Sequence, residues 1–339
     1  MSIRDAIAAV VARRDLSEDE AAATMEEIMT DAATPSQIAA LLTALRMKGE
    51  TTDEIAGMVR VMRAKAVPLA LDGDVLDVVG TGGGSFDPVN ISTAAALVCA
   101  SAGVKVAKHG NRGFTSMSGA ANVLEALGAK IDLTPAQAKV CVDKCGFCFL
   151  LAPVYHPSMR FAGPTRVEIA VRTIFNSLGP LTNPAGAQTQ LIGVGDPKLA
   201  PKIAEVMARL GTKRTLVVHS EGGLDEVSLA SPTQVFDITG HEVKQYTLTP
   251  EEAGLARIPL SQVQSGSAAE NADRLHAVFA GTKGADRDYV LINAGTALMV
   301  AGKATTVREG VQLAAQTIDS GATSRTLDAY VAASNEASA

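Results

Sequence analysis

From Val75 onward, short apolar runs rich in β-branched residues alternate with longer Ala-rich stretches, and this alternation restricts the possible folds more than any other feature. The apolar runs are residues 75–79, 104–107, 147–152, 215–219 and 289–293. The Ala-rich stretches often end at Gly, as at Gly103 and Gly128. Strands that alternate with helices predict a mainly parallel sheet with helices on its faces. Ligands of such sheets bind beyond the carboxyl ends of the strands.

Residues 1 to about 66 carry only helical signals. Three hydroxyl residues are each followed three positions later by Glu or Gln, the spacing of a capping box. The pairs are Ser17 with Glu20, Thr34 with Gln37, and Thr51 with Glu54. Pro35 stands at a first helical position, and Gly49 stands where that helix is expected to end. The sequence therefore predicts a small all-helical N-terminal domain followed by a large α/β domain.

Composition excludes several classes of function. The net charge is −6 over 339 residues, which argues against a general nucleic-acid surface, although a cleft can still be locally positive. No run of 18 apolar residues exists, so no membrane span is expected. The apolar patch at 7–12 is short and flanked by charges, unlike a secretion signal. With four Cys and no export signal, a cytoplasmic, reducing location is expected.

A glycine-rich segment, DVVGTGGGSFDPVNIST at residues 77–93, joins the first strand to a helix expected to start near Asn90. Glycines let a backbone approach a phosphate closely, and the N–H groups of a helix start attract anions. The segment lacks the Lys of a Walker A loop, and Ser85 breaks the dinucleotide fingerprint. A tight turn without a ligand is the alternative. The hydroxyls of Ser92 and Thr93 favour phosphate binding.

Two further segments follow predicted strands. The first, residues 108–120 (KHGNRGFTSMSGA), is dense in hydrogen-bond donors, which favours phosphate binding; a solvated polar loop is the alternative. Two phosphate-binding loops at neighbouring strand ends predict a ligand with two phosphate groups. GGLDEVSL at 222–229 places Asp225 and Glu226 at another strand end. Carboxylates repel phosphates unless a divalent cation lies between them, and Mg²⁺ binds in this way.

The segment at 152–185 predicts a helix from Arg166 to Ser177, with Arg166 and Arg172 available for a carboxylate or a phosphate. His156 is a candidate for the wall of a site. Three cysteines at 141, 145 and 148 fall on a predicted helix and an apolar strand. We interpret them as small core residues rather than metal ligands, because a structural zinc needs four ligands.

These segments together resemble the anthranilate phosphoribosyltransferase family. GTGG followed by NIST, KHGNR, LEALG, YHP, RTIFN, GPLTNP and GLDE occur in the family's order and spacing over nearly the whole chain. The resemblance implies Mg²⁺-dependent transfer of the phosphoribosyl group from phosphoribosyl pyrophosphate to the amino group of anthranilate, in tryptophan biosynthesis. It also implies a small domain of residues 1–70 joined by part of about 165–190, a large domain of 71–164 and 191–339, and a homodimer through the helical domains.

The resemblance also implies a role for individual residues. The catalytic residues would be Lys108, Arg166, Asp225 and Glu226. Phosphoribosyl pyrophosphate would be bound by Gly80, Gly83, Gly84, Asn90, Ile91, Ser92, Thr93, Lys108, His109, Gly110, Asn111, Arg112, Gly113, Phe114, Thr115, Ser116 and Ala120. Anthranilate would be bound by Gly80, His109, Asn111, His156 and Arg166. Mg²⁺ would be bound by Ser92, Asp225 and Glu226.

The chain departs from the family's usual pattern at several positions. Gly84 stands where an Asp is common, so we expect a metal dependence different from that of a Gly84→Asp variant. Pro88, Phe114, Met117, Ala120 and Asn122 also replace common family residues. Three alternatives remain open at this point: the same chemistry on a substituted anthranilate, a pyrimidine nucleoside phosphorylase, and a non-catalytic relative that binds nucleic acid.

Overall fold

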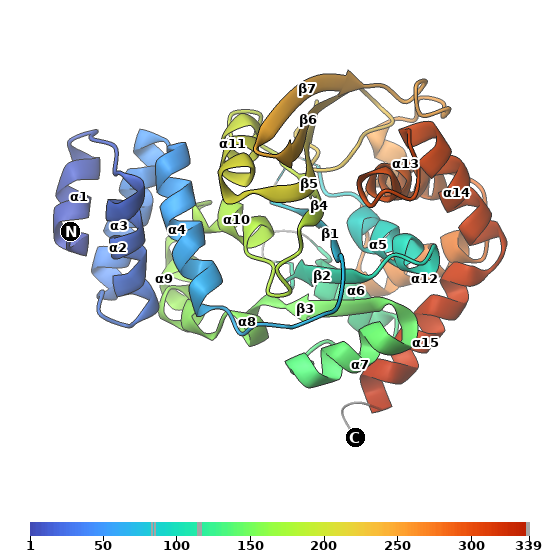
Figure 1. Ribbon diagram of the computed structural model, residues 1–339, viewed down its shortest axis with the longest axis horizontal. Helices are drawn as coiled ribbons and strands as arrows, with labels where there is room; N and C mark the ends of the chain where they lie inside the picture. The colour runs from blue at the N-terminus through green and yellow to red at the C-terminus, as the bar shows by residue number, and fades with distance from the viewer. Residues whose placement is uncertain (83, 85, 114–116, 337–339) are drawn as a thin grey trace.

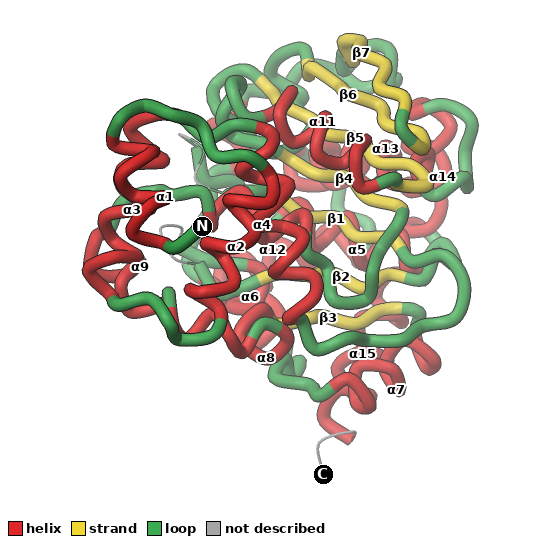
Figure 2. The backbone as a smooth tube through the Cα atoms, turned by 60° about the vertical axis from the view of Figure 1, so that its left-hand side comes forward, coloured by secondary structure: helices red, strands yellow, loops and turns green. Residues whose placement is uncertain are grey.

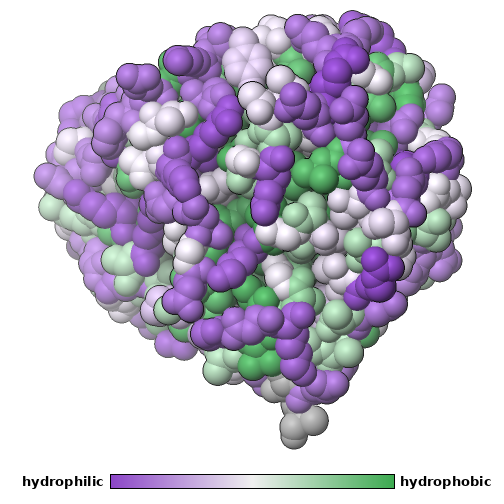
Figure 3. All heavy atoms as spheres, turned by 45° about the vertical axis from the view of Figure 1, so that its right-hand side comes forward, coloured by the Kyte–Doolittle hydropathy of each residue, from purple (hydrophilic) through white to green (hydrophobic). Residues whose placement is uncertain are grey.

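The computed structural model describes residues 1–336 except 83, 85 and 114–116. A group of helices at one end of the molecule stands beside a larger body built on a twisted sheet (Figure 1). On the face shown in Figure 3, apolar side chains lie in small groups between hydrophilic ones. Within the described residues, no helix is both long enough and apolar enough to cross a bilayer.

The large body is organised by a sheet that, in the described residues, has seven strands in the order β3-β2-β1-β4-β5-β6-β7. The strands are β1 (Leu76–Gly80), β2 (Val106–Gly110), β3 (Phe147–Leu151), β4 (Thr189–Gly193), β5 (Thr212–Ser220), β6 (Thr233–Gly240) and β7 (Glu242–Leu248). Strands β1 to β5 are parallel, whereas β6 and β7 add antiparallel pairs at one edge. The prediction of a mainly parallel sheet is therefore confirmed. Figure 2 shows the strands stacked through the body between layers of helices.

The N-terminal helices are α1 (Ile3–Val11), α2 (Glu18–Met29), α3 (Pro35–Lys48) and α4 (Thr52–Lys65). The predicted capping boxes are present: the hydroxyls of Ser17, Thr34 and Thr51 each accept the N–H three residues later. Helix α3 ends at Gly49 with a φ of +88°, which an L side chain rarely adopts. Short-range signals were therefore sufficient to predict this helical part.

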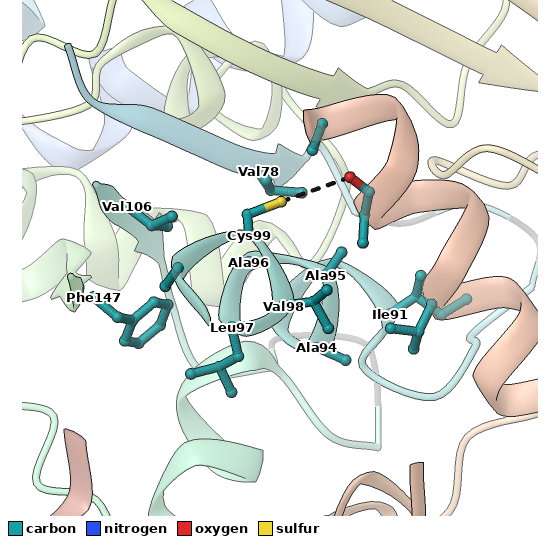
Figure 4. Close-up of a cluster of buried hydrophobic side chains, with 14 of the residues drawn as sticks. Val78, Ile91, Ala94, Ala95, Ala96, Leu97, Val98, Cys99, Val106 and Phe147 are labelled. Atoms are coloured by element: carbon teal, nitrogen blue, oxygen red, sulfur yellow. Dashed lines mark hydrogen bonds between the residues drawn. The ribbon is translucent and has the colours of Figure 1, made fainter. Parts of the chain in front are cut away.

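The remaining helices surround the sheet. They are α5 (Ile91–Ser101), α6 (Ala120–Ala126), α7 (Pro135–Cys145), α8 (Ala152–Tyr155), α9 (Gly163–Ile169), α10 (Phe175–Leu178), α11 (Ala200–Leu210), α12 (Ala268–Phe279), α13 (Ala285–Val300), α14 (Val307–Asp319) and α15 (Ala322–Glu336). Figure 4 shows α5 in the core beside Val78, Val106 and Phe147 of three neighbouring strands. The Cys99 thiol of α5 donates to the Ala294 carbonyl of α13 at 3.7 Å. These contacts hold α5 against the sheet and against α13.

The prediction of a strand at 289–293 is wrong, because this apolar run lies inside α13. Thirteen of the sixteen residues of this helix are buried, so it is apolar on nearly all sides. A helix of this kind shows no helical periodicity, and a short apolar run from it cannot be distinguished from a buried strand.

The prediction of a single helix from Arg166 to Ser177 is also wrong. Helix α9 ends at Ala170, which has a φ of +49°, and a separate short helix, α10, follows. The Thr173 N–H donates to the Asn176 side chain at 3.0 Å, so a new turn begins there instead of the first helix continuing. The intervening residues carry Arg172 toward the carboxyl end of the sheet.

Candidate active site

A cavity of about 270 Å³ lies beyond the carboxyl ends of β1 and β2 and the start of α5. Both predicted phosphate-binding loops and the predicted carboxylate pair line it. Its predicted members are Gly80, Asn90, Ser92, Thr93, Lys108, His109, Gly110, Asn111, Arg112, Gly113, Ala120, Asp225 and Glu226. Members of the wall that the sequence did not single out include Thr81, Gly82, Asp87 and Asn176. Residues as distant in the sequence as Gly80 and Glu226 thus meet at one place.

The glycines of the first loop make room for a carboxylate of the protein itself. The Gly82 N–H donates to Asp225 Oδ2 at 2.8 Å. A Cβ on Gly80 would lie 2.3 Å from the same oxygen, and a Cβ on Gly193 of β4 would lie 1.7 Å from the Asp225 carbonyl oxygen. Both positions therefore require glycine as long as Asp225 remains where it is. The sequence pattern indicates phosphate binding by these glycines, but it does not reveal that the position of Asp225 also requires them.

Charges of both signs are concentrated at this wall. Lys108 is 1% exposed, and its ammonium donates to the Val78 carbonyl and to Ser92 Oγ, the latter at 3.2 Å. Burial lowers the pKa of Lys108, although the nearby carboxylates oppose that shift. Burial raises the pKa of Asp225, and burial together with the neighbouring Asp225 raises the pKa of Glu226 to about 8. The two carboxylates thus repel each other in a poorly solvated place.

The donor set of this wall fits Mg²⁺. Asp225, Glu226 and the Ser92 hydroxyl supply hard oxygen atoms, and a divalent cation would relieve the repulsion between the carboxylates. Within the described part of the chain, no three His, Cys, Asp or Glu side chains gather into a closed metal site. An ion held here would therefore complete its shell with substrate oxygens and water, as Mg²⁺ usually does.

Asp77, inside β1, is fully buried and was not among the predicted site residues. Its carboxylate accepts hydrogen bonds from the backbone N–H of His109 at 3.2 Å and from the side-chain amide nitrogen of Asn183 at 2.7 Å. The same amide donates to the Ala107 carbonyl at 2.8 Å. Asn183 belongs to the GPLTNP motif, so this motif holds β1 and β2 together directly behind Lys108. A charged residue inside an apolar run was the only local signal of this role.

The stability of the protein should depend on the charge of Asp77. Burial raises the pKa of Asp77 from 3.8 to about 6. Its stabilising contribution is therefore fully present below about pH 4 and is lost as the pH rises through about 6. We expect the free energy of unfolding of Asp77→Asn, relative to wild type, to rise by roughly 3 kcal/mol between about pH 4 and pH 7. Urea titrations at several pH values measure it; a pH-independent difference would contradict the assignment.

Two histidines form the inner wall. The His109 and His156 rings lie 5.1 Å apart, His109 Nδ1 donates to the Gly179 carbonyl, and His156 Nε2 donates to the Thr182 carbonyl, both at 3.1 Å. Burial lowers the pKa of His109 to about 3 and that of His156 to about 4, so both rings are neutral near pH 7. Among the described residues, His109 Nε2 is buried without a hydrogen-bond partner. It is therefore a free acceptor on a residue of the cavity wall.

Comparisons with known proteins agree with this geometry. The "Glycosyl transferase family, helical bundle domain" matches residues 4–66, and the "Glycosyl transferase family, a/b domain" matches residues 72–324. An anthranilate phosphoribosyltransferase of Moorella thermoacetica is 51% identical over 327 residues, 96% of each chain. The chain belongs to the anthranilate phosphoribosyltransferase family. The match extends over both parts of the fold.

Solved structures of anthranilate phosphoribosyltransferases have the same fold. The enzyme from Thermus thermophilus is 43% identical, with a TM-score of 0.91 over 98% of this chain and 99% of that one. The enzyme from Saccharomyces cerevisiae, solved in complex with phosphoribosyl pyrophosphate (PRPP) and Mg, is 28% identical, with a TM-score of 0.90 over 98% of each chain. The predicted fold class is thus confirmed by whole-chain similarity.

Several residues that the family resemblance implied lie away from the cavity wall. In the described part of the chain, Gly84, Ile91, His156 and Arg166 are not on that wall. The Arg166 guanidinium lies 5.2 Å from the centroid of the Phe175 ring. Arg172 is on the wall instead, and its guanidinium donates to the Thr81 carbonyl at 3.3 Å. Arg112 is on the wall, but its guanidinium pairs with Glu125. Gly83, Phe114, Thr115 and Ser116 lie outside the described residues.

Two departures from the family pattern have a structural account. The Asn122 side-chain oxygen accepts the N–H groups of Gly113 and Gly119, at 2.9 and 3.1 Å, and so brings the two ends of the second loop together. A Cβ on Gly84 would lie 1.7 Å from the Gly223 carbonyl oxygen. A Gly84→Asp variant would therefore displace the segment that carries Asp225 as well as add a charge, so its Mg²⁺ titration cannot isolate the effect of charge.

Proposed function

We propose that this protein transfers the 5-phosphoribosyl group of PRPP to the amino group of anthranilate and releases pyrophosphate, with Mg²⁺, in tryptophan biosynthesis. The observation that carries the proposal is the common wall formed by both phosphate-binding loops, Lys108 and the Asp225–Glu226 pair. This wall places cationic and N–H donors opposite a carboxylate pair, as a magnesium pyrophosphate group requires.

Catalysis in this proposal comes mainly from alignment and charge. The glycine loop and the start of α5 hold the phosphates, and Lys108 neutralises charge on the departing pyrophosphate. Ser92, Asp225 and Glu226 would hold Mg²⁺, which would supply further positive charge to the same group. Bond breaking at the anomeric carbon precedes most of the bond formation, and no covalent enzyme intermediate forms. Because an aniline nitrogen is unprotonated at neutral pH, no strong base is needed.

The anthranilate site in this proposal lies between His109 and Arg166. His109 Nε2 accepts a hydrogen bond from the anthranilate amino group, and His156 holds the His109 ring from behind. Arg166 binds the carboxylate of anthranilate, whereas Arg172, which contacts Thr81 of the glycine loop, acts on the PRPP side. Asn111 and Gly80 complete the anthranilate pocket.

The experiment is anthranilate consumption with PRPP and Mg²⁺, repeated for Arg166→Ala and Arg172→Ala. We expect wild-type turnover, an anthranilate KM raised roughly tenfold in Arg166→Ala through the loss of one charged hydrogen bond, and a PRPP KM raised in Arg172→Ala. Absence of wild-type turnover would contradict the activity. An unchanged anthranilate KM in Arg166→Ala would contradict the acceptor assignment alone. Thymidine and phosphate provide the control for nucleoside phosphorolysis.

We further propose that residues 1–70 and part of about 165–190 form one domain, that 71–164 and 191–339 form the other, and that two helical domains pair in a homodimer. In support of the division, α9 contacts α3 and α10 contacts α4. In support of the pairing, the large exposed apolar residues include Met1, Val11, Met47, Val167 and Val171, all on or beside the helical part. The four cysteines are free, which supports a cytoplasmic location.

A further inference from the structure

A buried asparagine of α12 is hydrogen-bonded to the start of α5. Asn271 is fully buried, and its amide nitrogen donates to Asn90 Oδ1 at 3.0 Å and to Ser265 Oγ at 2.9 Å. Its oxygen accepts the Gly266 N–H at 2.9 Å. Both N–H donors and the oxygen of this amide are thus bonded inside the protein. Asn271 is not on the cavity wall in the described part of the chain.

These bonds determine how Asn90 faces the second phosphate-binding loop. Because Asn90 Oδ1 accepts from Asn271, its amide nitrogen is left to donate, and it does so to the Ser118 carbonyl at 2.9 Å. The Ser118 hydroxyl donates back to Asn90 Oδ1 at 3.3 Å. Without Asn271 only the two bonds to Ser118 would hold the Asn90 amide in this orientation. Asn271 therefore fixes both the start of α5 and the loop ending at Ser118.

A second buried asparagine, on the neighbouring helix α13, is bonded to the carboxylate segment. Asn293 Oδ1 accepts the Val227 N–H at 2.9 Å, and its amide nitrogen donates to the Val227 and Tyr289 carbonyls, each at 2.9 Å. Asn293 is fully buried. Val227 directly follows Glu226, so this two-way bond to the backbone fixes the end of the carboxylate pair. Figure 1 shows α12 and α13 on the same side of the body as α5.

We propose that Asn271 and Asn293 are positioning residues that act on different parts of the site. Asn271 positions the phosphate-binding loops through Asn90, and Asn293 positions Asp225 and Glu226 through Val227. The proposal rests on the proposed function. It predicts two separable defects, because no hydrogen bond of Asn271 reaches the carboxylate segment and none of Asn293 reaches Asn90, among the described residues.

The test compares Asn271→Ala, Asn293→Ala and the exposed control Asn335→Ala, whose side chain donates to the Gly128 and Val331 carbonyls. We expect Asn271→Ala to raise the PRPP KM on the order of tenfold, through the loss of buried hydrogen bonds, with a smaller rise in the Mg²⁺ half-saturation at saturating PRPP than Asn293→Ala causes, because Ser92 follows Asn90 on α5. We expect Asn293→Ala to raise the Mg²⁺ half-saturation by a similar factor with the PRPP KM at saturating Mg²⁺ unchanged. Equal shifts of both quantities in both variants, or lower thermal stability with neither quantity changed, would overturn the proposal.

Calorimetric titration with magnesium pyrophosphate keeps this test independent of turnover. We expect magnesium pyrophosphate to bind Asn271→Ala more weakly than Asn335→Ala, whether or not the wild type consumes anthranilate. Absence of anthranilate consumption by the wild type would contradict the proposed function only. Equal binding by these two variants would overturn the role of Asn271. If an Ala variant fails to fold, the corresponding Ser variant, which keeps one hydroxyl donor, replaces it and is judged by the same two quantities.

Discussion

Replacing Asp225 with Asn is expected to lower kcat by about 10²- to 10³-fold at saturating PRPP and anthranilate, the range measured when one fixed electrostatic contact of a transition state is removed. The change keeps the size of the side chain and can keep an oxygen facing the Gly82 N–H. It removes one of the two charges that would hold Mg²⁺ against the departing pyrophosphate. The effect should therefore fall on turnover and on Mg²⁺ dependence together.

The measurement is initial rate as a function of Mg²⁺ concentration, with Asp72→Asn as the control. Asp72 is exposed and lies before the amino end of β1, at the opposite edge of the sheet. Thermal unfolding of both variants shows whether the fold is retained. Wild-type turnover by Asp225→Asn at every Mg²⁺ concentration would remove Asp225 from the metal site.

The second large effect is expected for Gly193→Ala, although this glycine has no functional group of its own. A Cβ at this position would lie 1.7 Å from the Asp225 carbonyl oxygen, and the obstructing atom is backbone, so the carboxylate segment must shift. A displacement of about 1 Å at a catalytic group can cost on the order of 10² in rate, so kcat/KM should fall by about that factor. Steady-state kinetics measure it.

Gly163→Ala is the matched control for Gly193→Ala. Nothing lies within 4 Å of the Cβ that this change adds, and Gly163 has no positive φ. The control should keep wild-type kinetics. A Gly193→Ala variant that also keeps them would show that the carboxylate segment moves aside without loss, and the tight contact would then have no role in catalysis.

The sequence allowed most of the wall of the cavity to be predicted, because its loops follow strands and are dense in donors. Local signals of this kind identified Ser92, Lys108 and Asp225. The same reasoning missed β4, β6 and β7 and took part of α13 for a strand, since short apolar runs fit either structure.

Contacts between distant residues account for the rest of the site. Gly193, Asn183, Asn271 and Asn293 act on residues between 32 and 181 positions away, as in the pair Asn271 and Asn90. No local sequence pattern indicates such contacts, because Gly and Asn at these positions differ in no visible way from Gly and Asn elsewhere in the chain. Residue type alone makes Arg166 and Arg172 candidates, but only the break at Ala170 decides which of them reaches the cavity wall.

The close approach of Gly84 to Gly223 has a consequence for how this sequence can evolve. Gly195 lies against the same place, with the Gly84 Cα 3.1 Å from where its Cβ would be. The backbone of Gly223 thus occupies the space that a side chain at position 84 would need, and the backbone of Gly84 occupies the space that one at position 195 would need. Substitutions among these positions are therefore expected to be strongly non-additive. A carboxylate can return to position 84 only after the backbone near Gly223 has moved, so the order of mutations decides whether that path is open.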